Sequence, residues 1–150
     1  MNAGISIKGM EPEWLAKVVD KSNKMIRAAM LEASGEVDTA LGLYVEAAQI
    51  EEQLAEYCRG LGLLEKAYIS AVSAAGLWAR AGDLYRALQG YEALINDPTL
   101  TPRMRTHICG LADKMRERRR QWSVYSRQLR DAEEERSMEP ARSEQSVSVG

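Results

Sequence analysis

The chain has 150 residues, of which 45% are hydrophobic and 28% are charged, and its formal net charge is −2. These values are ordinary for a soluble globular domain with enough length to bury a core. The sequence has no apolar run near the roughly 20 residues needed to cross a bilayer, which excludes a membrane-spanning protein. No charged segment followed by an apolar run opens the chain, so we expect no signal peptide and a cytoplasmic location.

Helical periodicity begins close to the N-terminus. Residues 1–11 contain two glycines and little periodicity, and we expect them to be flexible. Pro12 suits the first position of a helix, where its missing N–H costs nothing, so a helix is predicted at about 12–33. Gly35 interrupts the pattern. Apolar residues then recur with a 3.6-residue period over about 36–58, which predicts a second helix.

Two shorter helices should follow. Gly60 and Gly62 mark the end of the second helix, because glycine takes the positive φ common just past a helix. A third helix is predicted at about 63–80. Asp83 is a good N-cap residue, and it introduces a fourth helix at about 84–96.

The clearest start signal belongs to the fifth helix. Thr101-Pro102 supplies a hydroxyl cap followed by proline at the first helical position, and the helix is predicted at 102–135. Residues 136–150 are rich in Ser and Glu and are expected to be disordered. No run alternates between apolar and polar residues, so we predict one all-α domain over 12–135, built from antiparallel helical hairpins with a long C-terminal helix.

One short pattern occurs twice. GEVDTALGLYVEA at 35–47 aligns with GDLYRALQGYEAL at 82–94. Glycine lets the chain reverse between antiparallel helices, alanine lets the helices touch, and tyrosine fills the next layer. The matched residues are Gly35 and Gly82, Ala40 and Ala87, Leu41 and Leu88, and Tyr44 and Tyr91.

The second copy resembles a tetratricopeptide repeat. Its small, aromatic, glycine and proline positions are Ala74, Ala75, Trp78, Gly82, Ala87, Tyr91 and Pro98. The resemblance implies that a partner lies in a concave groove lined by the first helix of each hairpin. Carried over by position, it implies contacts from Met25, Arg80, Arg103 and Lys114. Residues 12–58 more weakly resemble microtubule-interacting-and-trafficking domains, which bind short helical peptides.

The fifth predicted helix carries an uneven charge. Residues 103–130 hold nine basic and two acidic residues, and an apolar stripe with Trp122 and Tyr125 runs beside them. Three hypotheses fit: a solvated capping helix whose arginines pair with acidic residues, a helix for protein binding or self-association, or a helix that contacts nucleic-acid phosphates. The predicted partner-binding residues are Met25, Arg80, Arg103, Lys114, Arg116, Arg119, Arg120, Trp122 and Tyr125.

Nothing in the sequence favours catalysis. His107 and Cys109 are two residues apart, so on a helix their side chains point about 200° apart and cannot act as a pair. No metal-ligand spacing and no phosphate-binding glycine motif occurs. Cys58 and Cys109 are predicted to be buried thiols. We expect a non-enzymatic scaffold or adaptor, without metal or cofactor, that binds a protein partner or forms a homodimer. The alternative is a small nucleic-acid-associated regulator.

Overall fold

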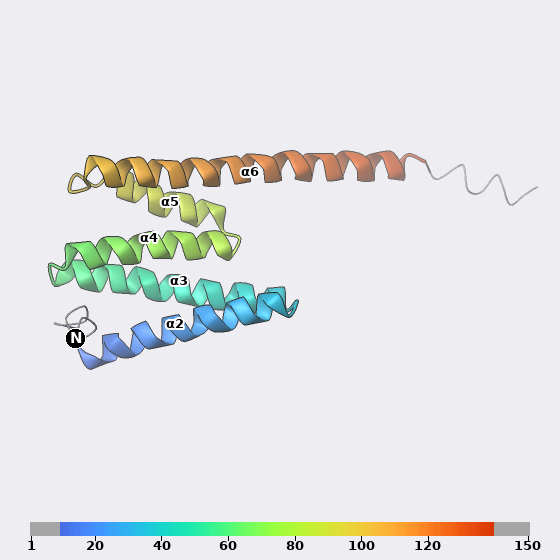
Figure 1. Ribbon diagram of the computed structural model, residues 1–150. Helices are drawn as coiled ribbons and strands as arrows, with labels where there is room; N and C mark the ends of the chain where they lie inside the picture. Colours follow the sequence, from blue (N-terminus) through green and yellow to red (C-terminus); the bar gives the residue numbers. More distant parts are fainter. Residues whose placement is uncertain (1–9, 140–150) are drawn as a thin grey trace, which may run out of the picture. The chain divides into compact units, whose positions relative to one another are not determined.

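The computed structural model describes residues 10–139, and in that range it consists of α-helices joined by short turns (Figure 1). The five helices are α2 (Pro12–Ala33), α3 (Val37–Gly60), α4 (Leu64–Arg80), α5 (Leu84–Ile95) and α6 (Pro102–Ser137). The predicted all-α fold with packed consecutive helices and a long C-terminal helix is confirmed. Every predicted helix boundary lies within two residues of the observed one.

The two predicted flexible ends fall largely outside the described residues. At the N-terminal end, Glu11 is described and is the N-cap of α2, because its carbonyl accepts the N–H groups of Trp14 and Leu15. At the other end, α6 continues to Ser137, two residues into the predicted tail. Met10, Met138 and Glu139 lie outside the helices, and residues 1–9 and 140–150 are not described.

The chain divides into two compact units, residues 1–115 and 116–150, and the boundary lies inside α6. The first unit contains α2 to α5 and the beginning of α6. The second contains the rest of α6. The prediction of one domain over 12–135 stays a prediction.

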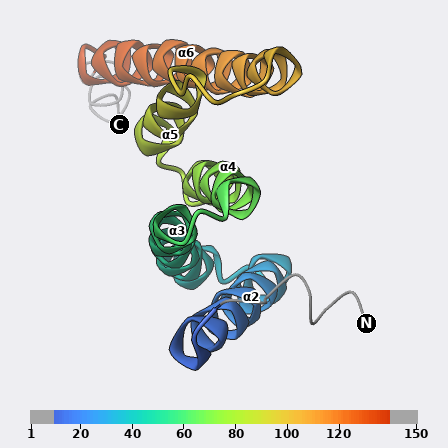
Figure 2. The same ribbon diagram turned by 90° about the vertical axis from the view of Figure 1, so that its left-hand side faces the viewer.

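Within the first unit, helices that are neighbours in sequence are neighbours in space. α3 packs against both α2 and α4, and α4 packs against α5. Figure 2, which looks along the helices, shows the axes in a zigzag, with α3 and α5 on one side and α2 and α4 on the other. Each consecutive pair is therefore an antiparallel hairpin, and the hairpins share helices.

Three identical turns produce this zigzag. Gly35, Gly62 and Gly82 have φ values of 88°, 78° and 88°, a region that glycine occupies without strain. In each turn the glycine N–H and the following N–H donate to the last turn of the preceding helix, at 3.1 Å and 2.8–2.9 Å. This is the Schellman arrangement, which satisfies carbonyls that a helix end leaves open. The residue after each glycine is also the N-cap of the next helix.

An alanine follows each turn at the same position. Ala40, Ala67 and Ala87 each stand five residues after the turn glycine, and each is buried. The sequence pattern is therefore glycine, any residue, Val or Leu, two further residues and alanine, and it occurs three times. The copy at 62–67 has the same geometry as the other two, although only two copies were recognised from the sequence.

The core of the first unit is built mainly from small residues and a few large ones. Tyr44 and Ile108 are among the largest side chains that are fully buried, and Trp78 is 4% exposed. Gly90 of α5 lies so close to α4 that a Cβ there would stand 3.1 Å from the Cβ of Ala75. Small residues thus let neighbouring helices approach closely. The core is filled in this way although the chain contains no phenylalanine.

Candidate functional site

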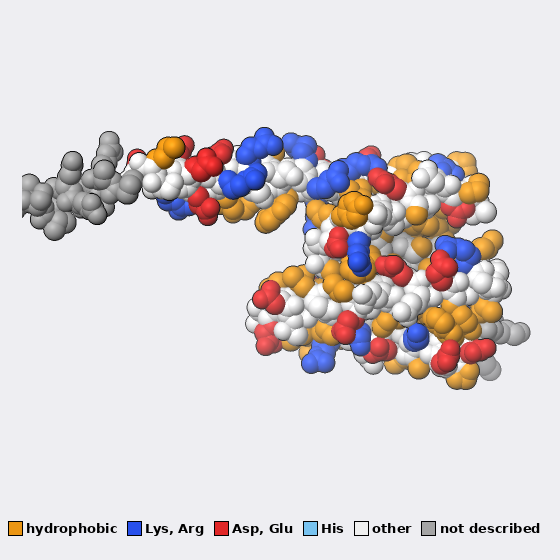
Figure 3. Space-filling view, turned by 180° about the vertical axis from the view of Figure 1, so that it is seen from behind, with side chains coloured by type: hydrophobic (Ala, Val, Ile, Leu, Met, Phe, Trp, Pro, Cys, Tyr) orange, Lys and Arg blue, Asp and Glu red, His pale blue; other side chains and the backbone are white. Residues whose placement is uncertain are grey.

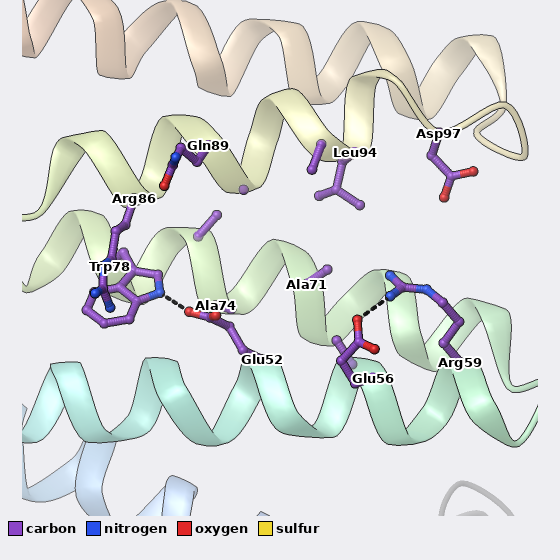
Figure 4. Close-up of a pocket in the computed structure, with 14 residues that line it drawn as sticks. Glu52, Glu56, Arg59, Ala71, Ala74, Trp78, Arg86, Gln89, Leu94 and Asp97 are labelled. Atoms are coloured by element: carbon purple, nitrogen blue, oxygen red, sulfur yellow. Dashed lines mark hydrogen bonds and ion pairs between the residues drawn. The ribbon is translucent and has the colours of Figure 1, made fainter.

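A groove of about 670 Å³ runs over α4 between α3 and α5 (Figure 4). Its floor is formed by Ala71, Ala74 and Ala75 of α4, together with Gly90 of α5. Small side chains at these positions leave space that larger residues would fill. The groove is therefore a consequence of the same small residues that let α4 and α5 pack closely.

Trp78 lies toward one end of the groove and is held on two sides (Figure 4). Its indole N–H donates a hydrogen bond to the Glu52 carboxylate of α3. The Arg86 guanidinium of α5 lies 4.4 Å from the centroid of the ring, in cation–π geometry. Asp83 stands 3.6 Å from Arg86 and completes the chain of contacts. These contacts join α3, α4 and α5 and fix the position of the ring.

Charged groups of both signs line the rest of the rim. Arg59 and Glu56 form an exposed ion pair at 2.6 Å. Exposed pairs of this kind contribute little to stability. Arg59 and Glu56 could therefore separate to contact a ligand with little loss of stability. Asp97 lies toward the other end, where hydrogen bonds from the Thr99 hydroxyl and backbone N–H lower the pKa of the Asp97 carboxyl. The carboxylate is thus ionised at neutral pH.

The predicted groove residues do not line this groove. Met25 packs against the core from α2, and the Arg80 guanidinium lies 4.7 Å from the centroid of the buried Tyr44 ring. Arg103 and Lys114 are exposed on α6. The resemblance placed the contacts on the first helix of each hairpin, and α4 is such a helix, but the groove uses its face with Ala71, Ala74 and Ala75 and not Arg80. Because the i, i+3, i+4 spacing of Ala71, Ala74 and Ala75 is also that of an ordinary buried helix face, the sequence held no separate signal for the groove.

The described part of the second unit is the remainder of α6, where large apolar side chains are exposed. Trp122 is 64% exposed and Tyr125 is 52% exposed, and their ring centroids are 5.9 Å apart. At about 100° per residue, both fall on the same face as Leu129, within roughly 60°. We call Trp122, Tyr125 and Leu129 the aromatic face of α6.

The arginines of this segment lie mainly on the opposite face. Figure 3 shows Lys and Arg side chains gathered along one side of this part of α6 and hydrophobic side chains along the other. Helical spacing places Arg116, Arg120 and Arg127 opposite the aromatic face and Arg119 and Arg130 beside it, whereas Arg118 falls on the aromatic face itself. Arg116 and Arg120 of the predicted site therefore lie on the other side of α6 from Trp122 and Tyr125.

Arg105 and Arg120 have structural partners near them in the chain. Arg105 donates to the carbonyls of Ile95 and Asp97, and it thereby caps the end of α5. Arg120 contacts the Glu117 carboxylate through two nitrogens, at 2.6 and 3.0 Å. Arg105 therefore has a structural role at the end of α5.

The two cysteines and the possible metal ligands were the remaining candidates for reactive chemistry. Cys58 is buried, and burial raises the pKa of its thiol. Cys109 is half-buried, so the prediction that both thiols are buried is correct for Cys58 alone. Among residues 10–139, no group of His, Cys, Asp and Glu side chains is placed to hold a metal ion. No helix in the same range is both long enough and apolar enough to cross a bilayer.

Comparison with known proteins adds no relative. No protein-family model matches the chain, and neither the curated proteins nor the solved structures contain a significant match. The resemblances to tetratricopeptide repeats and to microtubule-interacting-and-trafficking domains stay predictions, carried by the residues of this chain alone.

Proposed function

We propose that this protein is a non-enzymatic scaffold or adaptor of the cytoplasm, with tetratricopeptide-like hairpins, that binds another protein through the aromatic face of α6. The observation that carries the proposal is the exposure of Trp122 and Tyr125. Buried tryptophan and tyrosine are the residue types that dominate binding energy at protein interfaces. A solvated helix gains nothing from them, because their apolar rings would stand in water.

The spacing of this face favours a helical partner. Trp122, Tyr125 and Leu129 follow one another at intervals of three and four residues, which is the spacing that packs one helix against another. A partner with its own apolar helix face, or a second copy of this chain, fits that spacing. The groove over α4, with its uncharged floor and rim of both charge signs, offers a second contact surface for a peptide.

The proposal is tested by affinity capture from an extract of the native cells, with and without nuclease. We expect Trp122→Ala/Tyr125→Ala to reduce capture of the bound protein by at least tenfold, because each ring contributes on the order of 1 kcal/mol or more at an interface. The matched variant Arg120→Gln/Arg127→Gln, which changes the opposite face, should retain the partner. Unchanged capture by the aromatic variant would refute the proposal.

The alternative is a nucleic-acid-associated regulator, favoured by the basic face of α6. Binding through several arginines would fall steeply between low and physiological salt, and it would not survive nuclease. Loss of binding in the Arg120→Gln/Arg127→Gln variant, with the aromatic variant unaffected, is the result that would select this alternative. A partner held by aromatic residues would respond little to salt.

A further inference from the structure

The outward face of α2 is the second large apolar surface of the molecule. α2 is the first helix of the stack, and α3 is the helix that packs against it. Its inner face is occupied: Ala28 is fully buried, and Lys21 pairs with the buried Glu51 of α3 at 2.5 Å. On the outer face Val19, Ile26 and Met30 are 59%, 61% and 67% exposed.

This outer face is free of charge. At about 100° per residue, an arc of roughly 120° along α2 contains Leu15, Val19, Ser22, Asn23, Ile26 and Met30. The other residues in the arc are uncharged as well, so no Asp, Glu, Lys or Arg interrupts it over 22 residues. The first helix of a stacked helical protein normally turns a polar side to water. We call this arc the outer face of α2.

We propose that the outer face of α2 is a self-association surface, on which α2 of a second copy packs antiparallel. The proposal goes beyond the binding function argued for α6 and does not depend on it. Two arguments identify the occupant: the apolar pattern is self-complementary, and the charges that border it are complementary only in this orientation.

The apolar pattern reads the same in both directions. A two-fold axis between residues 22 and 23 sets Val19 against the partner subunit's Ile26 and Leu15 against the partner subunit's Met30. Ser22 and Asn23 then meet at the axis, where two short polar side chains can share hydrogen bonds. Such alternating layers are the packing that two antiparallel helices require.

The bordering charges select the antiparallel orientation. Asp20 and Arg27 lie on the same edge of the outer face, and both are exposed. In an antiparallel pair this edge faces the same edge of the partner, so Asp20 meets the partner subunit's Arg27, and the pair occurs twice. In a parallel pair the edge would face the uncharged side that carries Val18 and Ala29, and the ion pairs would be lost.

The expected affinity is modest. A helix of 22 residues is about 33 Å long, so the outer face offers on the order of 300 Å² on each subunit. That is less than the roughly 800 Å² per partner of a standard stable interface. We therefore expect a dissociation constant on the order of 10 µM, which corresponds to a weak, concentration-dependent dimer.

Sedimentation velocity of the full chain, over about 1 to 200 µM, tests the proposal. The wild type should shift from monomer to dimer across this range, and Ile26→Glu should weaken the dimer by at least tenfold. The matched control is Ile69→Glu, which changes an isoleucine on α4 with a similar exposure of 55% and should leave the dimer intact. Circular dichroism verifies that each variant keeps its helix content.

A charge swap distinguishes this interface from other modes of association. Arg27→Asp should weaken the dimer several-fold, and Asp20→Arg/Arg27→Asp should restore it, because the swapped pairs regain opposite signs. A wild type that is monomeric at 200 µM overturns the proposal. So does a dimer that Ile26→Glu leaves intact and that Trp122→Ala/Tyr125→Ala dissociates, since that result would assign self-association to α6 and would support the function proposed above.

Discussion

The ion pair between Lys21 and Glu51 joins α2 to α3 in a nearly dry setting. The Glu51 side chain is 3% exposed and the Lys21 side chain 19%, and the two charged atoms stand 2.5 Å apart. Taking two charges out of water costs several kcal/mol, which the mutual attraction offsets while both are present. The pair therefore adds little net stability, but the loss of one member leaves a buried charge without compensation.

The Lys21→Met variant should expose this imbalance. We expect it to lower the free energy of unfolding by about 3 kcal/mol, as breaking a buried pair commonly does. Urea denaturation followed by circular dichroism measures the change. Lys24→Met, which removes the exposed pair with Asp20, should cost less than about 0.5 kcal/mol. The double variant Lys21→Met/Glu51→Leu should recover most of the loss. If Lys21→Met and Lys24→Met lowered the free energy of unfolding equally, the burial of the Lys21–Glu51 pair would not matter for stability.

The sequence could not identify that pair. Charge alternates along α2, with Lys17, Lys21 and Lys24 at similar spacing, and each could equally face water. Which lysine meets a carboxylate depends on the rotation of α2 against α3. That rotation is set by the burial of Ala28 and the packing of Met25, which only the folded contacts reveal.

The helices and their turns were the most predictable features. Glycine next to a periodic apolar segment identified the breaks at Gly35 and Gly82, and both glycines have the positive φ expected of them. The turn at Gly62 obeys the same rule. It was missed as a repeat because Ala71 stands where the other two copies have tyrosine.

The same substitution should have opposite effects at two glycines. Gly82→Ala should destabilise the protein by about 1 kcal/mol or more, because alanine is strained at a φ of 88°. Gly42→Ala in α3 should stabilise it by up to about 1 kcal/mol, because Gly42 is helical and a Cβ there meets no atom within 4 Å. Thermal or urea unfolding of both variants gives the sign. A Gly82→Ala variant as stable as wild type would show that the turn tolerates another conformation.

The whole molecule combines a packed stack with a largely solvated helix. Residues of α3 and α4 supply much of the buried core, while nearly every described residue of the second unit is exposed. A single helix without tertiary packing is only marginally stable in water. Stability should therefore differ strongly between the two units.

Hydrogen exchange should resolve this difference. Backbone amides of α3 and α4 should exchange at least a hundredfold more slowly than those of residues 116–137, because opening α3 or α4 requires the core to unfold. Mass spectrometry of peptic peptides at about 1 µM, below the expected dimer range, provides the measurement. Protection of residues 116–137 equal to that of α4 would contradict the prediction, whereas protection gained on adding a partner would agree with the function proposed for α6.

The sequence by itself determined the all-α class and the bounds of the five helices to within two residues. These depend on local signals, namely 3.6-residue periodicity, glycine, proline and cap residues, which act over a few positions.

The tertiary structure decided which faces of the helices meet. The groove lies over α4 between α3 and α5, and Arg105 donates to the carbonyl of Ile95 at the end of α5. The outer face of α2 is not covered by α3. Such features depend on how each helix is rotated against its neighbour. That rotation results from the fit of many small contacts between residues distant in sequence, which no local pattern records.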